Sequence, residues 1–89
     1  MKYEISGEVS VRKIGDEVFV FDRRNCVLHT FNDTGAFIWE LMIEKTPLAA
    51  IPAMVAERFE TDVGQASLDM TDFINELEKN RLVSLTASV

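Results

Sequence analysis

The chain has 89 residues, which is enough for one folded domain and too few for two. Apolar residues make up 47% and charged residues 27% of the sequence, a composition typical of a folded protein and not of a disordered one. The formal net charge of −6 disfavours nucleic acid as a partner, because phosphate binding requires a basic surface.

No apolar run reaches the ~20 residues that a membrane-spanning helix requires, and the first ten residues lack the apolar region of a signal peptide. We therefore expect no membrane partner and a cytoplasmic location. Cys26 and His29 are the only cysteine and histidine, which excludes an internal disulfide and a structural zinc site. We expect Cys26 to be a small buried hydrophobic residue and His29 to be an exposed strand residue.

The first third of the chain has the pattern of β-strands. Residues 8–14 and 17–22 are rich in Val and Phe, and Gly15 and Asp16 between them are typical of a two-residue hairpin loop. After a polar turn, residues 26–31 form a third predicted strand. We expect a three-stranded antiparallel meander with residues 17–22 in its centre.

The pattern becomes helical after residue 31. Asn32 or Asp33 can cap the next helix, because their side chains accept hydrogen bonds from its first N–H groups. The residues that follow are apolar on most sides of a helix and include Trp39, the only tryptophan. We expect this segment to be core and not the lining of a site.

A second helix is predicted from Thr46 as its N-cap and Pro47 at its first position. Its apolar stripe has the spacing of one buried face and consists of Leu48, Ile51, Val55 and Phe59. Pro52 conflicts with a regular helix, because it removes a hydrogen bond and crowds the preceding turn. Either the first turn is distorted, or the regular helix begins nearer Pro52.

The third predicted helix covers residues 63–79. Asp62 is a suitable N-cap, and Gln65 three residues later makes an approximate capping box. Asn80 can adopt the left-handed conformation that ends a helix, and residues 81–85 return as a short extended segment. The expected buried stripe of this helix is Ala66, Met70, Phe73 and Leu77.

Neither a catalytic site nor a metal site is predicted. Asp69, Asp72 and Glu76 share one side of the third helix, but no histidine joins them, and a solvated acidic face is the favoured interpretation. No glycine lies in a phosphate-binding loop, and His29 is the only candidate base for nucleophilic catalysis. We expect no enzymatic activity and no cofactor.

Three helices beside a small sheet give an α+β fold with the outline of a winged helix-turn-helix. Its DNA-binding use is disfavoured, because the last helix carries several carboxylates where a recognition helix is basic. An acyl carrier protein is also disfavoured, because residues 66–70 lack the Asp that precedes an attachment serine and the first third is not helical.

The third strand is the candidate binding element. Residues 26–31 contain neither proline nor a permanent charge, the usual means of protecting a strand edge. An extended peptide can add there as a fourth strand, or the edge can be covered by a helix or a second copy of the chain. Pattern alone leaves both open. An uncharged flank of the third helix could form a groove wall: Val63, Ser67, Thr71 and Ile74.

Several motifs together resemble the PqqD-like family, named for a coenzyme PQQ synthesis protein. The resemblance covers residues 9–85, nearly the whole chain. In order, the matching motifs are Phe31-Asn32-Asp33-Thr34-Gly35, Ile38-Trp39-Glu40-Leu41, Thr46, Arg58-Phe59 and Leu82-Val83.

The resemblance implies one domain over residues 1–89 that acts as a RiPP recognition element. Such a domain binds the leader of a ribosomally made precursor peptide by strand addition. It presents that peptide to a modifying enzyme, often a radical S-adenosylmethionine enzyme. Carried over to this sequence, the peptide-binding residues are Cys26, Val27, Leu28, His29, Thr30, Phe31, Ser67, Met70, Thr71 and Ile74.

The sequence therefore leaves two alternative functions. The first is a peptide chaperone for such a leader, and the alternative is an acidic scaffold or regulatory domain without a leader peptide. They differ in one structural requirement, because the first needs a free edge at the third strand.

Overall fold

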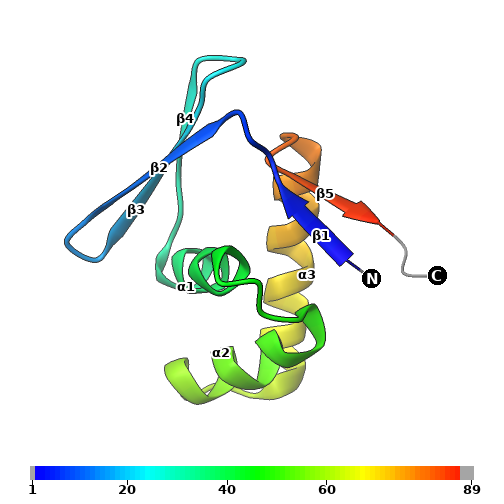
Figure 1. Ribbon diagram of the computed structural model, residues 1–89. Helices are drawn as coiled ribbons and strands as arrows, with labels where there is room; N and C mark the ends of the chain where they lie inside the picture. Colours follow the sequence, from blue (N-terminus) through cyan, green and yellow to red (C-terminus); the bar gives the residue numbers. More distant parts are fainter. Residues whose placement is uncertain (1, 87–89) are drawn as a thin grey trace.

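The structure, a computed structural model, describes residues 2–86 and has an α+β fold. A three-stranded meander precedes three α-helices, as predicted, and a second small sheet joins the two ends of the described chain (Figure 1). Within residues 2–86, no helix has the length and apolarity needed to cross a membrane. The elements in order are β1 (Lys2–Ile5), β2 (Val9–Ile14), β3 (Glu17–Asp22), β4 (Val27–Thr30), α1 (Asp33–Ile43), the 3₁₀ turn η1 (Leu48–Ala50), α2 (Ile51–Phe59), α3 (Val63–Lys79) and β5 (Val83–Thr86).

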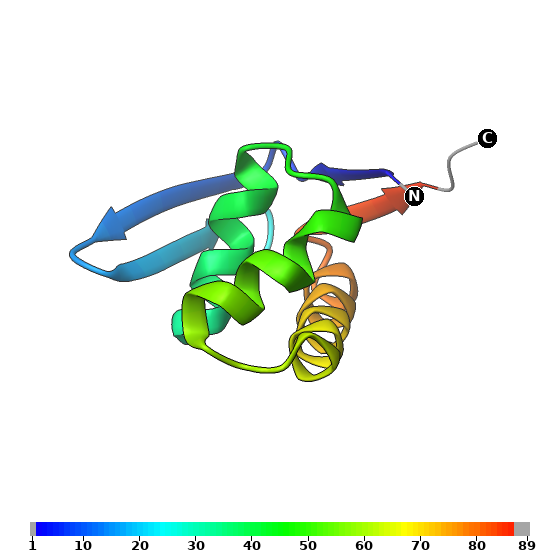
Figure 2. The ribbon, with the colours of Figure 1, turned by 90° about the horizontal axis from the view of Figure 1, so that it is seen from below.

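The meander has the order β2-β3-β4, with β3 in the centre and every pair antiparallel. Gly15 begins the two-residue loop between β2 and β3 with φ 61°, the sign required at the first central position of a type II′ turn. In β3 the side chains of Val18, Val20 and Asp22 are buried, so this face of the sheet lies on the helices. The β2–β3 hairpin extends beyond the helices into solvent (Figure 2).

The sheet of β1 and β5 was only half predicted. The extended segment after α3 is confirmed as β5, but β1 was not predicted as a strand. Its register joins Lys2 to Thr86, so its partner lies at the opposite end of the chain. Tyr3 fixes β1 to the helices, because its hydroxyl donates a hydrogen bond to the carbonyl of Thr46 at 2.7 Å. Burial raises the pKa of this phenol.

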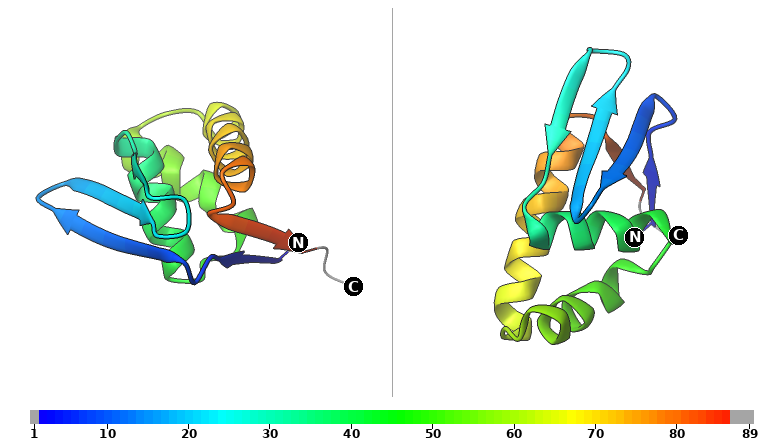
Figure 3. Two further views of the ribbon diagram at one scale, coloured as in Figure 1. Left: turned by 90° about the horizontal axis from the view of Figure 1, so that it is seen from above. Right: turned by 90° about the vertical axis from the view of Figure 1, so that its left-hand side faces the viewer.

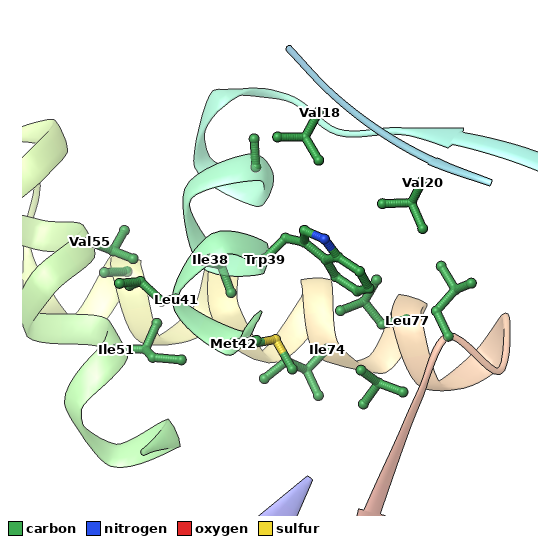
Figure 4. Close-up of a cluster of buried hydrophobic side chains, with 14 of the residues drawn as sticks. Val18, Val20, Ile38, Trp39, Leu41, Met42, Ile51, Val55, Ile74 and Leu77 are labelled. Atoms are coloured by element: carbon green, nitrogen blue, oxygen red, sulfur yellow. The ribbon is translucent and has the colours of Figure 1, made fainter. Parts of the chain in front are cut away.

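Helix α1 is the centre of the core. Asn32 is its N-cap, because the Asn32 side chain accepts a hydrogen bond from the Gly35 N–H at 2.8 Å. Trp39 is fully buried, as expected, and lies between the sheet valines and α3 (Figure 4). Full burial of one such side chain stabilises the fold by ~1.5–3 kcal/mol.

The prediction for the start of α2 was wrong, although the buried stripe of this segment is confirmed. Thr46 does not cap a helix. Instead, Pro47 precedes the 3₁₀ turn, and regular helix begins at Ile51 with Pro52 in its first turn. Proline is tolerated there, because the first helical N–H groups have no partner within the helix. Pro52 raised two possibilities, a distorted first turn and a later start of the regular helix, and the structure shows both.

Helix α3 has the predicted bounds. The Asp62 side chain accepts a hydrogen bond from the Gln65 N–H at 3.2 Å, which confirms the cap. The Gln65 side chain does not complete a capping box, because its amide donates to Asp69. Asn80 was wrongly expected to take the left-handed conformation. It has φ −87°, and Arg81 takes that conformation with φ 60°.

Candidate peptide-binding site

Strand β4 has a free edge. Within residues 2–86, β4 pairs with β3 and with no other strand. Its outer edge lies on the side of the sheet where α3 passes (Figure 3, right). The structural requirement of the peptide-binding interpretation is therefore met by the described chain.

The register identifies which backbone groups of β4 point outward. Ile14 and Glu17 close the two-residue hairpin, and pairs alternate between hydrogen-bonded and non-hydrogen-bonded along an antiparallel ladder. The Arg23 N–H donates to the Glu8 carbonyl at 2.9 Å, which agrees with this alternation. Asp22 and Val20 therefore direct their backbone groups toward β4, where they face Val27 and His29. The remaining residues of β4 present their N–H and C=O groups to the free edge, and these are Leu28 and Thr30.

Two hollows lie beside α3 near this edge, and we call them together the β4–α3 cleft. They have volumes of about 430 and 310 Å³ and follow one another along the helix. The first lies between the start of α1 and α3 and has no lining residue from β4, whereas the second lies between β4 and the end of α3. The first is lined by Asn32, Thr34, Gly35, Ile38, Asp69, Asp72, Phe73 and Glu76. The second is lined by Asp22, Arg24, Asn25, Val27, His29, Lys79, Asn80 and Arg81.

An aromatic cluster fixes the two walls of the cleft relative to each other. Phe31 leaves β4 and turns inward, where its ring lies 5.6 Å from that of Trp39 and 4.9 Å from that of Phe73. The contact with Phe73 is edge-to-face, the arrangement that aromatic pairs prefer. Gly35 makes room for it, because a Cβ there would lie 3.0 Å from the Phe73 ring. The Asn-Asp-Thr-Gly turn thus has a structural role beside the cleft.

The charges of the cleft are sorted by sign along its length. The first hollow carries Asp69, Asp72 and Glu76 and no basic residue. The second carries Arg24, Lys79 and Arg81, with Asp22 as its one carboxylate. That carboxylate is satisfied within its own turn: Asn25 Nδ2 donates to it at 2.8 Å, and two backbone N–H groups donate to its other oxygen.

These hydrogen bonds hold the pKa of Asp22 below its usual range, with the Asn25 side chain as the largest cause. The turn therefore carries a fixed negative charge that is already used to order the backbone. A neighbouring arginine, Arg24, acts in the same direction on this pKa. The outward-facing charge at this end of the cleft is positive.

The structure places the predicted site residues unevenly. Four of them form β4: Val27, Leu28, His29 and Thr30. Val27 and His29 face the cleft, and His29 is half-buried, although an exposed residue was expected. Phe31 lies in the aromatic cluster behind the cleft.

Cys26 was wrongly expected to be buried. It is exposed, lies outside β4 in the preceding turn, and has φ 56°. A four-residue turn with a left-handed residue at its end explains both its exposure and the shorter strand.

The α3 residues proposed from the sequence do not line the cleft. Ile74 is buried in the core and Met70 packs against it. By helix periodicity, Ser67 and Thr71 stand on the opposite side of this core stripe from the cleft. The wall of the cleft is instead the acidic flank, which sequence reasoning had assigned to solvent. The sequence contained one indication that the acidic flank forms this wall. On the surface of the helix these carboxylates lie next to Phe73, the residue of the predicted buried stripe that is nearest to them.

Within residues 2–86 there is no group of three or more Cys, His, Asp or Glu residues that could hold a metal ion. The free edge of β4 offers backbone hydrogen-bonding groups, and the two hollows beside α3 carry charges of opposite sign. This combination can bind an extended peptide.

Comparisons with known proteins identify the family and the fold. Residues 17–83 match the family described as coenzyme PQQ synthesis protein D (PqqD), and the chain belongs to this family. The family consists of non-catalytic domains. No match is found among curated proteins.

Two solved structures are similar over almost the whole chain. One is TbiB1 in complex with the TbiA(beta) leader peptide, with a TM-score of 0.88, 25% sequence identity, and coverage of 99% of this chain and 100% of that chain. The other is lasso peptide synthetase B1 complexed with the leader peptide, with a TM-score of 0.78, 20% identity, and coverage of 96% and 100%. The second supports the fold alone.

Proposed function

We propose that this chain is a RiPP recognition element that binds the leader of a ribosomally made precursor peptide. The observation that carries the proposal is the free edge of β4 beside α3. The similarity to TbiB1, which holds a leader peptide, supports it.

In the proposed complex the leader adds to β4 as a further strand. Leu28 and Thr30 supply the N–H and C=O groups for the new ladder. Alternate side chains of the leader then enter the cleft, while the others lie on the outer face of the sheet. Main-chain hydrogen bonds contribute affinity, and the cleft contributes selectivity.

The bound leader is presented to a modifying enzyme, for which we propose a radical S-adenosylmethionine protein. The chain has no cofactor of its own in this scheme. It keeps the leader extended and holds it at one place, which raises the effective concentration of the precursor for the enzyme.

A pull-down from native lysate, read by mass spectrometry, tests the proposal. The full chain is compared with two proline variants of β4, Leu28→Pro and His29→Pro. Proline at 28 removes an outward N–H and leaves the β3 ladder intact, whereas proline at 29 removes a ladder bond inside the sheet. Val11→Pro is the matched control, because by the same alternation the Val11 N–H points outward from the other edge strand, β2.

Circular dichroism first establishes which variants are folded. The proposal predicts that the wild type and Val11→Pro retain a short peptide and a modifying enzyme, and that folded Leu28→Pro loses the peptide. If folded Leu28→Pro retains every partner, strand addition at β4 is wrong. The acidic scaffold without a leader then takes its place.

A further inference from the structure

We infer that the β4–α3 cleft selects leaders by charge order, with a Lys or Arg side chain at the Asn32 end and an Asp or Glu side chain at the Val27 end. The inference rests on the proposed function and names the class of leader that the site accepts. It follows from three features of the cleft: its floor, its unpaired charges and its direction.

The acidic end has the composition of a pocket for a long basic side chain. Its apolar floor is the half-buried ring of Phe73, because Ile38, which also borders the hollow, is fully buried. Its rim carries Asp69, Asp72 and Glu76. Lys and Arg place their methylene stems on apolar surface and keep the charged head among polar groups. The Phe73 ring can also attract that cation.

The carboxylates of this rim are available for such a cation. The ion pair found within residues 2–86 joins Lys13 to Glu40, away from the cleft. Asp69 accepts a hydrogen bond from the neutral amide of Gln65, and Glu76 accepts one from the neutral amide of Asn80. These contacts orient two of the carboxylates without neutralising any charge.

The basic end has the opposite composition. Arg24, Lys79 and Arg81 border the hollow, and within residues 2–86 none of them forms an ion pair. The nearby Asp22 carboxylate is occupied by its own turn. A carboxylate of the leader is therefore the group that this end favours.

The strand direction in the meander determines which part of a bound leader lies at each end of the cleft. Every pair in the sheet is antiparallel, and a new strand that continues this pattern runs antiparallel to β4. Its N-terminal part then lies at the Asn32 end and its C-terminal part at the Val27 end. The basic residue should precede the acidic one.

The spacing follows from strand geometry. Asn32 lies five positions after Val27, which is about 16 Å of extended backbone. Side chains on one face of a strand alternate, so the two residues are an even number apart. A separation of about four or six residues places both in the cleft.

A selection experiment tests the inference. The probe is an mRNA-displayed library of random peptides of about 12 residues, selected against the immobilised full chain. Parallel selections use Asp72→Lys/Glu76→Lys. The control with the same change in net charge is Glu44→Lys/Glu57→Lys, whose exposed residues do not line the cleft. Thermal unfolding checks that each variant is folded.

We expect peptides from the wild type and the control to carry Lys or Arg about four or six positions before Asp or Glu. Selection on Asp72→Lys/Glu76→Lys should exchange the basic preference for an acidic one and leave the other end unchanged. In fluorescence anisotropy, a selected peptide with its two charges exchanged should bind the wild type about tenfold more weakly, and less so at high salt.

The Leu28→Pro variant distinguishes failure of the charge-order inference from failure of the proposed function. If selected peptides are lost by Leu28→Pro but show no charge order, or if the order survives the cleft substitutions, the inference is overturned and the proposed function stands. If selected peptides bind folded Leu28→Pro as well as the wild type, the proposed function fails, and the inference with it.

Discussion

Substitution of Gly35 by alanine tests how closely α1 and α3 approach beside the cleft. An alanine Cβ would lie 3.0 Å from Phe73 Cε1, 3.2 Å from Phe31 Cβ and 3.2 Å from Asn32 Oδ1. Favourable contacts between carbon atoms begin at about 3.5 Å, so each of the two carbon neighbours must move by several tenths of an ångström. Asn32 Oδ1 cannot move freely, because it accepts the capping hydrogen bond from residue 35 itself.

The expected loss of stability is the difference between two effects. Forcing a methyl group into a packed site costs ~1–3 kcal/mol, whereas alanine is favoured over glycine within a helix by up to ~1 kcal/mol. We expect Gly35→Ala to lower the free energy of unfolding by about 1–2 kcal/mol. In a domain of this size each kcal/mol lowers Tm by about 4–8 °C.

Urea and thermal unfolding followed by circular dichroism measure the effect. Gly7→Ala is the control, because a Cβ there meets no atom within 4 Å and stability should change little. Phe73→Leu should reduce the penalty of Gly35→Ala in a double-mutant cycle, since it removes the closest contact. Unchanged or higher stability of Gly35→Ala would refute the reasoning, and would mean that the Phe73 ring yields freely.

Three further substitutions test other parts of the structure by the same unfolding measurements. Tyr3→Phe should lower the free energy of unfolding by about 1 kcal/mol, because the hydrogen bond to Thr46 is lost. Because burial raises the pKa of Tyr3, this loss of stability should be constant around neutral pH and should change only above about pH 10. Asp22→Asn should destabilise at pH 7. Because the pKa of Asp22 is lowered in the fold, chiefly by the Asn25 side chain, the difference should begin to shrink near about pH 4 and continue to shrink as pH falls further, through the lowered pKa. Cys26→Gly should stabilise by about 0.5–1 kcal/mol, because glycine adopts φ 56° without strain; a loss of stability would show that the thiol contributes packing.

Features set by neighbouring residues could be predicted from the sequence. The N-caps Asn32 and Asp62 bond to N–H groups three residues away, so the starts of α1 and α3 follow from local pattern. The Gly15 turn fixes the β2–β3 register in the same way. The burial of Trp39 follows from the apolar surroundings of its helix.

Features set by distant residues could not be predicted. β1 is a short strand whose partner is about 80 positions away, and nothing local requires the pairing of Lys2 with Thr86. The wall of the cleft is a similar case. Both flanks of α3 border the same buried stripe, and the contact between Phe31 and Phe73 decides which flank faces β4. Residue type alone favoured the uncharged flank.

The central claim is that a leader pairs with the free edge of β4, and amide hydrogen exchange of this strand tests it most directly. Exchange is measured by NMR on the full chain, free and saturated with a peptide recovered in the pull-down. The account predicts that the amides of Leu28 and Thr30 exchange quickly in the free chain and become protected in the complex. The outward amide of Val11 on β2 should not change. A bound peptide that leaves Leu28 and Thr30 unprotected, or protects Val11 instead, would contradict the account.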